Sequence, residues 1–544
     1  MTSVALWCII STVNIEILDT TLRDGVQGEG ISFSIDDKIA IVRALDELGI
    51  ALIEAGNPGS THTDRTFFQK LKTVHLTAST VCAFGATRKK GITAAEDTAL
   101  QQLLKAETDT VVIFGKAWDF HVRNVLKVSL SENLSLIYET ITFLCEHGRN
   151  VIFDAEHFFD AWKDNQTYAL SSIQTAFEAG AVRIVLCDTN GGTFPNELSA
   201  IINTVLEEAP YMRQCLGIHA HNDTGMACAN SIMAVQAGCT HVQGTLLGFG
   251  ERCGNAPLAV VIPNLALKLN YPCIDPGKLE HLTELSRRIA EIANISIPNT
   301  MPYIGKHAFS HKAGMHADGI LKNPRSFEHI APHQIGNNRH FLISEVSGRS
   351  IIAERVKAID PTVTRDSPFI ASLISRIKAL EAEGWQFEGA DASFELLIRR
   401  ERGLFKCPFF NLLAYRVSSE HPPAEALACS HAWVKVQVDG IAEIAAAEGY
   451  GPVHALDGAL RKALMRFYPQ LEQVRLSDFK VRVIDGTEAT AARVRVLIES
   501  FSPINSWTTV GVSEDIIDAS RAALIDSIDY ALFFFEKTTV EEPT

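Results

Sequence analysis

The sequence lacks the cysteine patterns that mark small disulfide or zinc domains. Its 11 cysteines are scattered singly, for example Cys82, Cys187, Cys253 and Cys407, and no C-x-x-C pair occurs. This spacing argues against a zinc ribbon and against a secreted disulfide framework. We therefore expect reduced thiols and a cytoplasmic protein.

Long runs of positive charge or of apolar residues are also missing. The longest basic run is the triplet Arg88-Lys89-Lys90, and Lys+Arg 49 against Asp+Glu 64 gives a formal charge of -15. This balance argues against a nucleic-acid or anionic-membrane surface. The apolar stretch Val4 to Ile10 has no cationic segment before it, and it is far shorter than the ~20 residues that span a bilayer. We expect partners to be small molecules or copies of the same chain, and no nucleic acid or membrane.

What the chain has is length and apolar content. Its 544 residues, 47% of them hydrophobic and 21% charged, are typical of a globular enzyme with a large core. At the usual ~100 to 200 residues per domain, the length predicts about three folded units.

The region 14–275 alternates short apolar runs with amphipathic stretches, which is typical of repeated βα units. In one such stretch, Ile39, Val42, Leu45 and Leu48 fall on one helical face and Gly49 stands at the stop position. Eight strand candidates predict an α/β fold of the (β/α)₈ TIM barrel type, with a doubly wound open sheet as the alternative. The candidates are Ile15 to Asp19, Ala51 to Gly56, Thr77 to Gly85, Thr110 to Gly115, Val151 to Glu156, Val182 to Thr189, Leu216 to His221 and His241 to Gly248.

The remainder divides into two expected parts. Residues 276–420 read as helical linker subdomains, and 421–540 as a C-terminal α+β domain that follows a hinge at Pro422-Pro423. In that domain Gly449 and Gly511 occupy matching places before two helical patterns. We interpret this as a duplicated βββα unit.

Polar residues end the predicted strands, where a barrel of this type carries its chemistry. His219 and His221 are two apart on one strand, so both imidazoles face the same side. An isolated pair of this kind is more often structural than a metal site. Here Asp24 closes the first strand turn and Asn255 the eighth, and those strands are neighbours in a closed barrel. The four side chains predict a divalent metal site with two open positions, and the ligand types fit Mg²⁺, Mn²⁺ or Zn²⁺.

Three further side chains surround this predicted site. Arg23 is adjacent to Asp24, and its guanidinium would stabilise an oxyanion on a polarised carbonyl. Glu156 ends the fifth strand and either assists proton transfer or forms a salt bridge. Thr189, in C-D-T-N-G-G, is a candidate donor to a substrate carboxylate.

Two histidines outside the barrel are candidates for the base that removes a proton next to a thioester. They are His311 and His316, in S-H-K-A-G-M-H-A-D-G. A neutral imidazole suits that task. Their spacing does not choose between them, and helix capping is the alternative for both.

Four motifs taken together resemble one enzyme family over nearly the whole chain. They are L-D-T-T-L-R-D-G-V-Q (Leu18 to Gln27), H-A-H-N-D-T-G (His219 to Gly225), G-E-R-C-G-N-A (Gly250 to Ala256) and G-M-H-A-D-G (Gly314 to Gly319). The family is the metal-dependent Claisen-condensing enzymes, which include isopropylmalate, homocitrate and citramalate synthases. G-E-G-I-S-F-S, F-G-K-A-W-D-F-H-V, D-A-E-H-F-F-D and C-D-T-N-G-G are most similar to the citramalate branch.

The resemblance implies an acyltransferase that condenses acetyl-CoA with pyruvate and hydrolyses the thioester, giving (R)-citramalate and CoA for isoleucine biosynthesis. It implies that the metal, Mg²⁺ or Mn²⁺ before Zn²⁺, is held by Asp24, His219, His221 and Asn255. Arg23 would polarise the keto oxygen and Thr189 would hold the keto acid. Glu156 and His316 would transfer protons.

The same resemblance bears on assembly and regulation. It implies a homodimer in which the helical region of one chain approaches the barrel of the other, so that His316 acts across the interface. It also implies that the C-terminal domain is an allosteric dimerisation domain with isoleucine as feedback inhibitor.

Three other functions stay open at this point. The same chemistry on 2-oxoisovalerate or 2-oxoglutarate would make the chain a 2-isopropylmalate or homocitrate synthase. Related barrels run the reverse cleavage as lyases, although the duplicated tail favours synthesis. The third alternative is a non-catalytic amino-acid sensor, in which only the C-terminal tail would be functional.

Overall fold

The structure is a computed structural model, and it describes residues 13–311, 314–341, 349–404, 408–420, 429–484, 492–502 and 505–541. These residues form two compact units. The first unit consists of two segments, the described residues up to Phe309 and Ile330–Arg339. The second unit consists of Ser310–His329 and the described residues from His340 onward. The apolar stretch Val4 to Ile10 and the hinge expected at Pro422-Pro423 lie outside the described residues.

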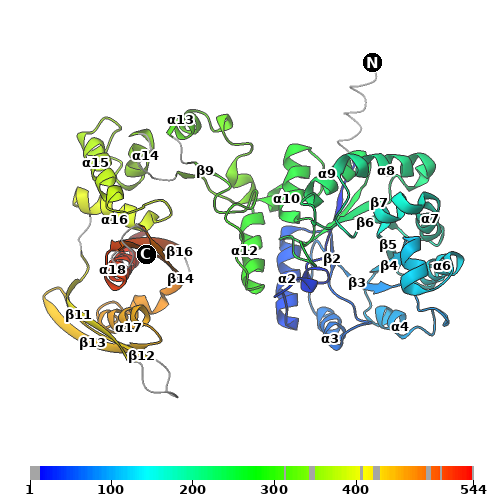
Figure 1. The fold of residues 1–544 in the computed structure, drawn as a ribbon, viewed down its shortest axis with the longest axis horizontal. Helices are drawn as coiled ribbons and strands as arrows, with labels where there is room; N and C mark the ends of the chain where they lie inside the picture. The colour runs from blue at the N-terminus through cyan, green and yellow to red at the C-terminus, as the bar shows by residue number, and fades with distance from the viewer. Residues whose placement is uncertain are drawn as a thin grey trace. The chain divides into compact units, whose positions relative to one another are not determined.

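Eight parallel strands form a closed barrel in the first unit, which confirms the predicted (β/α)₈ fold and excludes an open sheet (Figure 1). The ring closes where β8 pairs with β1, with Glu16 opposite His241. Each expected run overlaps one strand, and three strands extend one residue beyond it. The strands are β1 (Glu16–Asp19), β2 (Leu52–Glu54), β3 (Thr80–Ala86), β4 (Thr110–Lys116), β5 (Asn150–Glu156), β6 (Arg183–Asp188), β7 (Leu216–Ala220) and β8 (His241–Gly244).

Helices surround this barrel (Figure 1). They are α2 (Ile35–Leu48), α3 (His62–Leu71), α4 (Thr98–Lys105), α5 (Asp119–His121), α6 (Leu130–Glu146), α7 (Phe158–Glu178), α8 (Pro195–Glu208), α9 (Ala227–Ala237), α10 (Leu258–Pro263), α11 (Pro276–Leu279) and α12 (Leu282–Ile292). The first of them has the expected bounds because Ser34 and Asp37 form a capping box at its start. Gly49 ends it at φ 87, a left-handed conformation that glycine adopts without strain.

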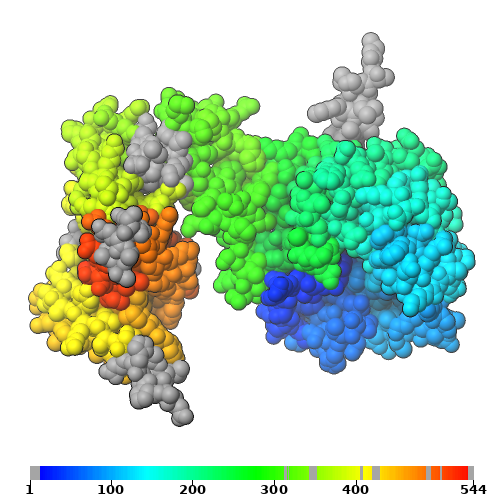
Figure 2. All heavy atoms as spheres, viewed as in Figure 1, coloured from blue at the N-terminus to red at the C-terminus, as the bar shows by residue number. Residues whose placement is uncertain are grey.

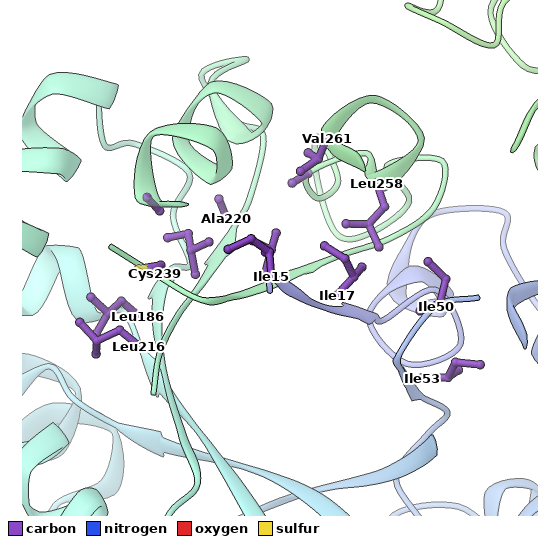
Figure 3. Close-up of a cluster of buried hydrophobic side chains, with 14 of the residues drawn as sticks. Ile15, Ile17, Ile50, Ile53, Leu186, Leu216, Ala220, Cys239, Leu258 and Val261 are labelled. Atoms are coloured by element: carbon purple, nitrogen blue, oxygen red, sulfur yellow. The ribbon is translucent and has the colours of Figure 1, made fainter. Parts of the chain in front are cut away.

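The outward faces of the strands pack against these helices in one large apolar core. Ile17 of β1 and Ile15 just before it lie beside Leu258 and Val261 of α10 (Figure 3). Because side chains alternate along a strand, the residues between them point into the barrel. The inward positions form a separate small apolar cluster, made of Leu18, Leu52, Cys82, Val112, Ile152, Val185 and Cys187. This cluster fills the barrel interior away from the carboxyl ends of the strands. Polar groups occupy the interior at those ends.

The second unit begins with the helices predicted for the middle of the chain and with two short strands that were not predicted. These are β9 (Ser310–His311), α13 (Gly314–Lys322), β10 (His340–Phe341), α14 (Arg349–Ile359), α15 (Pro368–Ala382) and α16 (Asp391–Arg402). No helix among the described residues is long and apolar enough to cross a membrane.

Two successive βββα units follow, as the matching glycines predict. The first is β11 (Asn411–Glu420), β12 (Cys429–Val438), β13 (Ile441–Gly449) and α17 (Pro452–Leu464), and the second is β14 (Arg475–Val483), β15 (Val494–Ser502), β16 (Asn505–Ser513) and α18 (Ile516–Glu541). Both sheets are antiparallel, and these two units are the part coloured yellow to red in Figure 2. A Cβ at Gly449 would lie 2.5 Å from the Ala455 nitrogen, and one at Gly511 would lie 2.0 Å from the Ala519 oxygen. Both glycines are required because the helix of each unit crosses its last strand at that point.

Candidate active site

Polar side chains occupy the inward positions above the apolar cluster of the barrel. Glu54, Asp154, His219 and Gln243 come from four different strands, and each is at most 4% exposed. They are on the inward face because Leu52, Ile152 and Gly217 two residues earlier face inward too. The carboxyl end of the barrel is therefore a buried polar site.

Three of the predicted metal ligands converge there. Ligand atoms of Asp24, His219 and His221 all lie within 4.8 Å of one another, and all three residues are buried. The Nε2 atom of His219 lies 3.6 Å from Asp24 Oδ2 and 3.4 Å from His221 Nε2. The predicted strand spacing of two residues thus brings both imidazoles to one point.

Asn255 lies against the same carboxylate. Its Nδ2 donates to Asp24 Oδ1 at 2.8 Å and to the Phe249 carbonyl at 3.0 Å, while its Oδ1 is buried with no hydrogen-bond partner. A backbone bridge between His221 and Asn255 joins the loops that carry them. Gly250 lies so close that a Cβ there would be 2.2 Å from Asn255 Nδ2.

The donor set fits a divalent cation. Burial would raise the pKa of Asp24, but the charge of Arg23, the neighbouring histidines and the hydrogen bond from Asn255 together lower that pKa to about 2. Burial lowers the pKa of His219 to about 4 and also lowers the pKa of His221. The site therefore holds a carboxylate and two neutral imidazoles at neutral pH, together with an orphaned amide oxygen. These are ligands for Mg²⁺, Mn²⁺ or Zn²⁺.

Arg23 is held in place from three sides. Its Nη1 pairs with Asp24 Oδ2 at 2.9 Å, and its Nε pairs with Glu54. The guanidinium carbon lies 3.9 Å from the centre of the Phe84 ring. Burial would lower the pKa of Arg23, but Glu54 and then Asp24 raise it, so the residue is a fixed cation at the site.

Glu156 ends β5, and Thr189 directly follows β6, the neighbouring strand. Glu156 is half-buried and pairs with Lys116, its register partner on β4, which matches the salt-bridge alternative. The Thr189 hydroxyl accepts a hydrogen bond of 2.9 Å from the His157 backbone N–H, which leaves its own O–H available as a donor. Arg252 connects the loops by donating to the Thr189 carbonyl at 2.7 Å and to Asp223 at 2.8 Å.

His316 belongs to the second unit. It is exposed on α13 and stacks on Phe327, with ring centres 4.2 Å apart. His311 lies 3.3 Å from Glu328 in the same unit. The structure therefore brings Asp24, His219, His221, Asn255 and Arg23 together within the barrel, and describes His316 on a separate body.

Family models and individual relatives place the chain in the same enzyme family. Residues 14–289 match the HMGL-like family, 303–384 match the homocitrate synthase post-HMGL domain-like family, and 388–532 match the LeuA allosteric (dimerisation) domain. An (R)-citramalate synthase of Aquifex aeolicus is 49% identical over 95% of this chain and 97% of its own length. The chain belongs to the (R)-citramalate synthase family.

Two further relatives show that the chain has a higher sequence identity to a citramalate synthase than to a 2-isopropylmalate synthase. An (R)-citramalate synthase of Synechocystis sp. is 47% identical over 95% of this chain and 96% of its own length. A probable 2-isopropylmalate synthase of Methanopyrus kandleri is 31% identical over 95% of this chain and 98% of its own length. As a member of the citramalate synthase family the chain is an acyltransferase that condenses an acyl-CoA with a keto acid. The match of the tail to a dimerisation domain agrees with assembly as a dimer.

Sequence reasoning missed two residues that contact the ligands. Gln243 Oε1 lies 2.9 Å from His219 Nδ1, and Gln243 Nε2 donates to Asp154 Oδ1 at 2.9 Å. The signal was a glutamine at an inward position of a short barrel strand, H-V-Q-G, where a buried amide needs partners. Gly250 was likewise read only as part of a motif.

Proposed function

We propose that the buried site of the barrel condenses acetyl-CoA with pyruvate and hydrolyses the thioester, giving (R)-citramalate and CoA. The observation that supports this most directly is the convergence of Asp24, His219 and His221 within 4.8 Å, with the orphaned Asn255 oxygen beside them. A keto acid presents a carboxylate and a ketone oxygen to such a site. The proposed place in metabolism is an entry into isoleucine biosynthesis.

In this proposal a divalent cation, Mg²⁺ or Mn²⁺ before Zn²⁺, is held by Asp24, His219, His221 and Asn255. When bound, it would supply Lewis-acid polarisation of the ketone and neutralise negative charge on the keto acid. The ligand atoms are oxygen and imidazole nitrogen, which all three ions accept.

The side chains around the site have distinct roles in the proposal. Arg23 is a fixed cation whose guanidinium stabilises negative charge on the former ketone oxygen as the new carbon–carbon bond forms. Thr189 donates its hydroxyl proton to the carboxylate of the keto acid. Burial of the site excludes water until the carbon–carbon bond has formed, and holding both substrates in line contributes to the rate.

Proton transfer is assigned to Glu156 and His316. His316 takes a methyl proton from acetyl-CoA, and Glu156, oriented by Lys116, orients the water that cleaves the thioester. The assignment of His316 goes with a homodimer in which the helical region of one chain serves the barrel of the other. His316→Ala should lower kcat much more than His311→Ala, and the reverse order would move the base to His311.

Regulation and domain limits complete the proposal. We place the catalytic barrel at 14–275, the helical linkers at 276–420 and the allosteric dimerisation domain at 421–540, with isoleucine as feedback inhibitor, except that β11 (Asn411–Glu420) pairs with β12 and so belongs to the dimerisation domain. The match of 388–532 to an allosteric dimerisation domain supports an allosteric domain in this part of the chain. The nine described cysteines are all free, which supports a reducing compartment such as the cytoplasm. Activity titrated with isoleucine, leucine and valine tests the effector, and inhibition by leucine alone would refute isoleucine.

A panel of keto acids tests the reaction. We expect CoA release from acetyl-CoA to be fastest with pyruvate and slower with 2-oxoisovalerate and 2-oxoglutarate. A pocket discriminates by only ~1 to 3 kcal/mol per methylene, or roughly 10- to 200-fold, so kcat/KM is the quantity to compare. Equal or greater kcat/KM with 2-oxoisovalerate would instead make the chain a 2-isopropylmalate synthase.

A further inference from the structure

A chain of hydrogen bonds crosses the barrel interior behind the metal-facing atoms of the site. It runs from Asp154 on β5 through Gln243 on β8 to His219 on β7, with both links 2.9 Å long. Asp154, Gln243 and His219 are at most 4% exposed. Because β5 and β8 are not neighbours in the barrel, the first of these bonds joins opposite walls.

Gln243, the middle residue, determines the direction in which these hydrogen bonds are donated. The amide of Gln243 offers one acceptor, Oε1, and one donating group, Nε2. Since Nε2 donates to Asp154, Oε1 faces His219 and can only accept. The imidazole must therefore carry its proton on Nδ1, and Nε2 presents its lone pair toward Asp24 and His221.

A reversed amide would remove this selection. If the Gln243 amide were turned over, its NH₂ group would face Nδ1 and favour the tautomer with the proton on Nε2, which binds no metal through that atom. The carboxyl oxygen of Asp154 makes this orientation unfavourable because it needs a donor. Hydrogen bonds of this kind commonly orient metal-ligating histidines and raise their basicity.

We propose that Gln243 is a positioning residue that fixes His219 as a metal ligand, and that Asp154 fixes the orientation of the Gln243 amide. This inference rests on the proposed metal site and extends it to two residues that contact neither substrate nor metal. It predicts that the effect of Gln243 is on metal affinity and ligand geometry.

The test is calorimetric titration of the full-length protein with Mn²⁺ alone. Gln243→Met keeps the side-chain length but removes the strong acceptor, and we expect it to weaken Mn²⁺ binding about 10- to 100-fold. Gln243→Glu keeps a carboxylate oxygen at the acceptor position and should restore most of the affinity. The visible absorption spectrum of Co²⁺ bound to each variant reports the ligand geometry, and it should change for Gln243→Met and return toward the original for Gln243→Glu.

Asn133→Leu is the matched control. Asn133 is another fully buried amide of the same barrel, and it donates to the Lys116 carbonyl and the Tyr168 hydroxyl, both at 2.8 Å. Its loss should lower the thermal stability but leave Mn²⁺ affinity and the Co²⁺ spectrum unchanged. The inference is overturned if Gln243→Met binds Mn²⁺ as the unaltered protein does, or if Gln243→Glu loses as much affinity as Gln243→Met. If the unaltered protein binds no divalent ion, the proposed metal site itself is refuted.

Discussion

Gly250→Ala is the substitution whose effect on the site can be worked out most directly from the structure. Gly250 has φ 148, and a Cβ built there lies 2.2 Å from Asn255 Nδ2 and 3.1 Å from Asp24 Oδ1. Non-bonded carbon contacts have their optimum near 3.5 Å, so the new methyl group overlaps the amide by about 1.3 Å. Asn255 must move, and with it the hydrogen bond that holds Asp24.

The expected consequence is a loss of metal affinity. Displacing the residue that orients a ligand typically costs about 10- to 100-fold, which is about 1.4 to 2.8 kcal/mol at 1.4 kcal/mol per factor of ten. Titration calorimetry with Mn²⁺ measures this directly, and kcat/KM at saturating Mn²⁺ shows whether the displaced site still works. Both should fall.

Gly148→Ala is the control for backbone strain. Gly148 has φ 75, and a Cβ there meets nothing within 4 Å. The substitution should cost about 1 to 2 kcal/mol of stability because alanine disfavours that conformation, while Mn²⁺ affinity stays unchanged. If Gly250→Ala binds Mn²⁺ as tightly as the unaltered protein, the pair Asp24 and Asn255 does not form the site.

Three further predictions concern the metal, the proton transfer and the base of the barrel. Chelator treatment should abolish CoA release and added Mn²⁺ should restore it; full activity after stripping would remove the metal from the proposal. Glu156→Gln should lower kcat by about 10²-fold or more with little change in KM for pyruvate. Glu197→Gln, at an exposed ion pair with Lys163, should change neither constant, and an equal effect of the two substitutions would refute the role. At the other end of the barrel, burial would raise the pKa of Glu16, but His241 and Arg183 lower it from 4.5 to about 2. A lowered acid pKa stabilises the fold above the unfolded value near 4.5, and this stability is lost as pH falls toward 2, with an upper bound of about 3 kcal/mol before solvent screening. Glu16→Gln should therefore destabilise the protein at pH 7 and much less at pH 3, measured by urea unfolding; an equal loss at both pH values would contradict this origin.

The fold could be predicted from the sequence because its signals are local. Each barrel strand is a short apolar run, and α2 carries both its capping box and its stop glycine within the chain segment that forms it. The duplicated tail was visible because Gly449 and Gly511 recur for one physical reason, the close passage of a helix over the last strand. Such signals can be recognised in the sequence without any knowledge of tertiary contacts.

The site was predictable only in part. The two-residue period of a strand was enough to place His219 and His221 on one face, and neighbouring strands brought in Asp24 and Asn255. The pairing of Lys116 with Glu156 needed the register of two strands. The contact of Gln243 with Asp154 spans the barrel, and no spacing along the chain encodes it.

The charges gathered in the barrel give the proposed chemistry a physical basis. The fixed cations are Arg23 and Lys116, and the carboxylates paired with them are Asp24, Glu54 and Glu156. Burial, and next the charge of Glu54, raises the pKa of Asp154, whose Oδ1 accepts the hydrogen bond from Gln243 Nε2. With neutral imidazoles, these ion-paired side chains, two cations and three carboxylates, together carry one net negative charge. A divalent ion reverses this to one positive charge, which a keto acid monoanion then cancels. A monovalent ion would leave no charge to attract that substrate, so the side chains of this barrel match a divalent cation and a singly charged keto acid together.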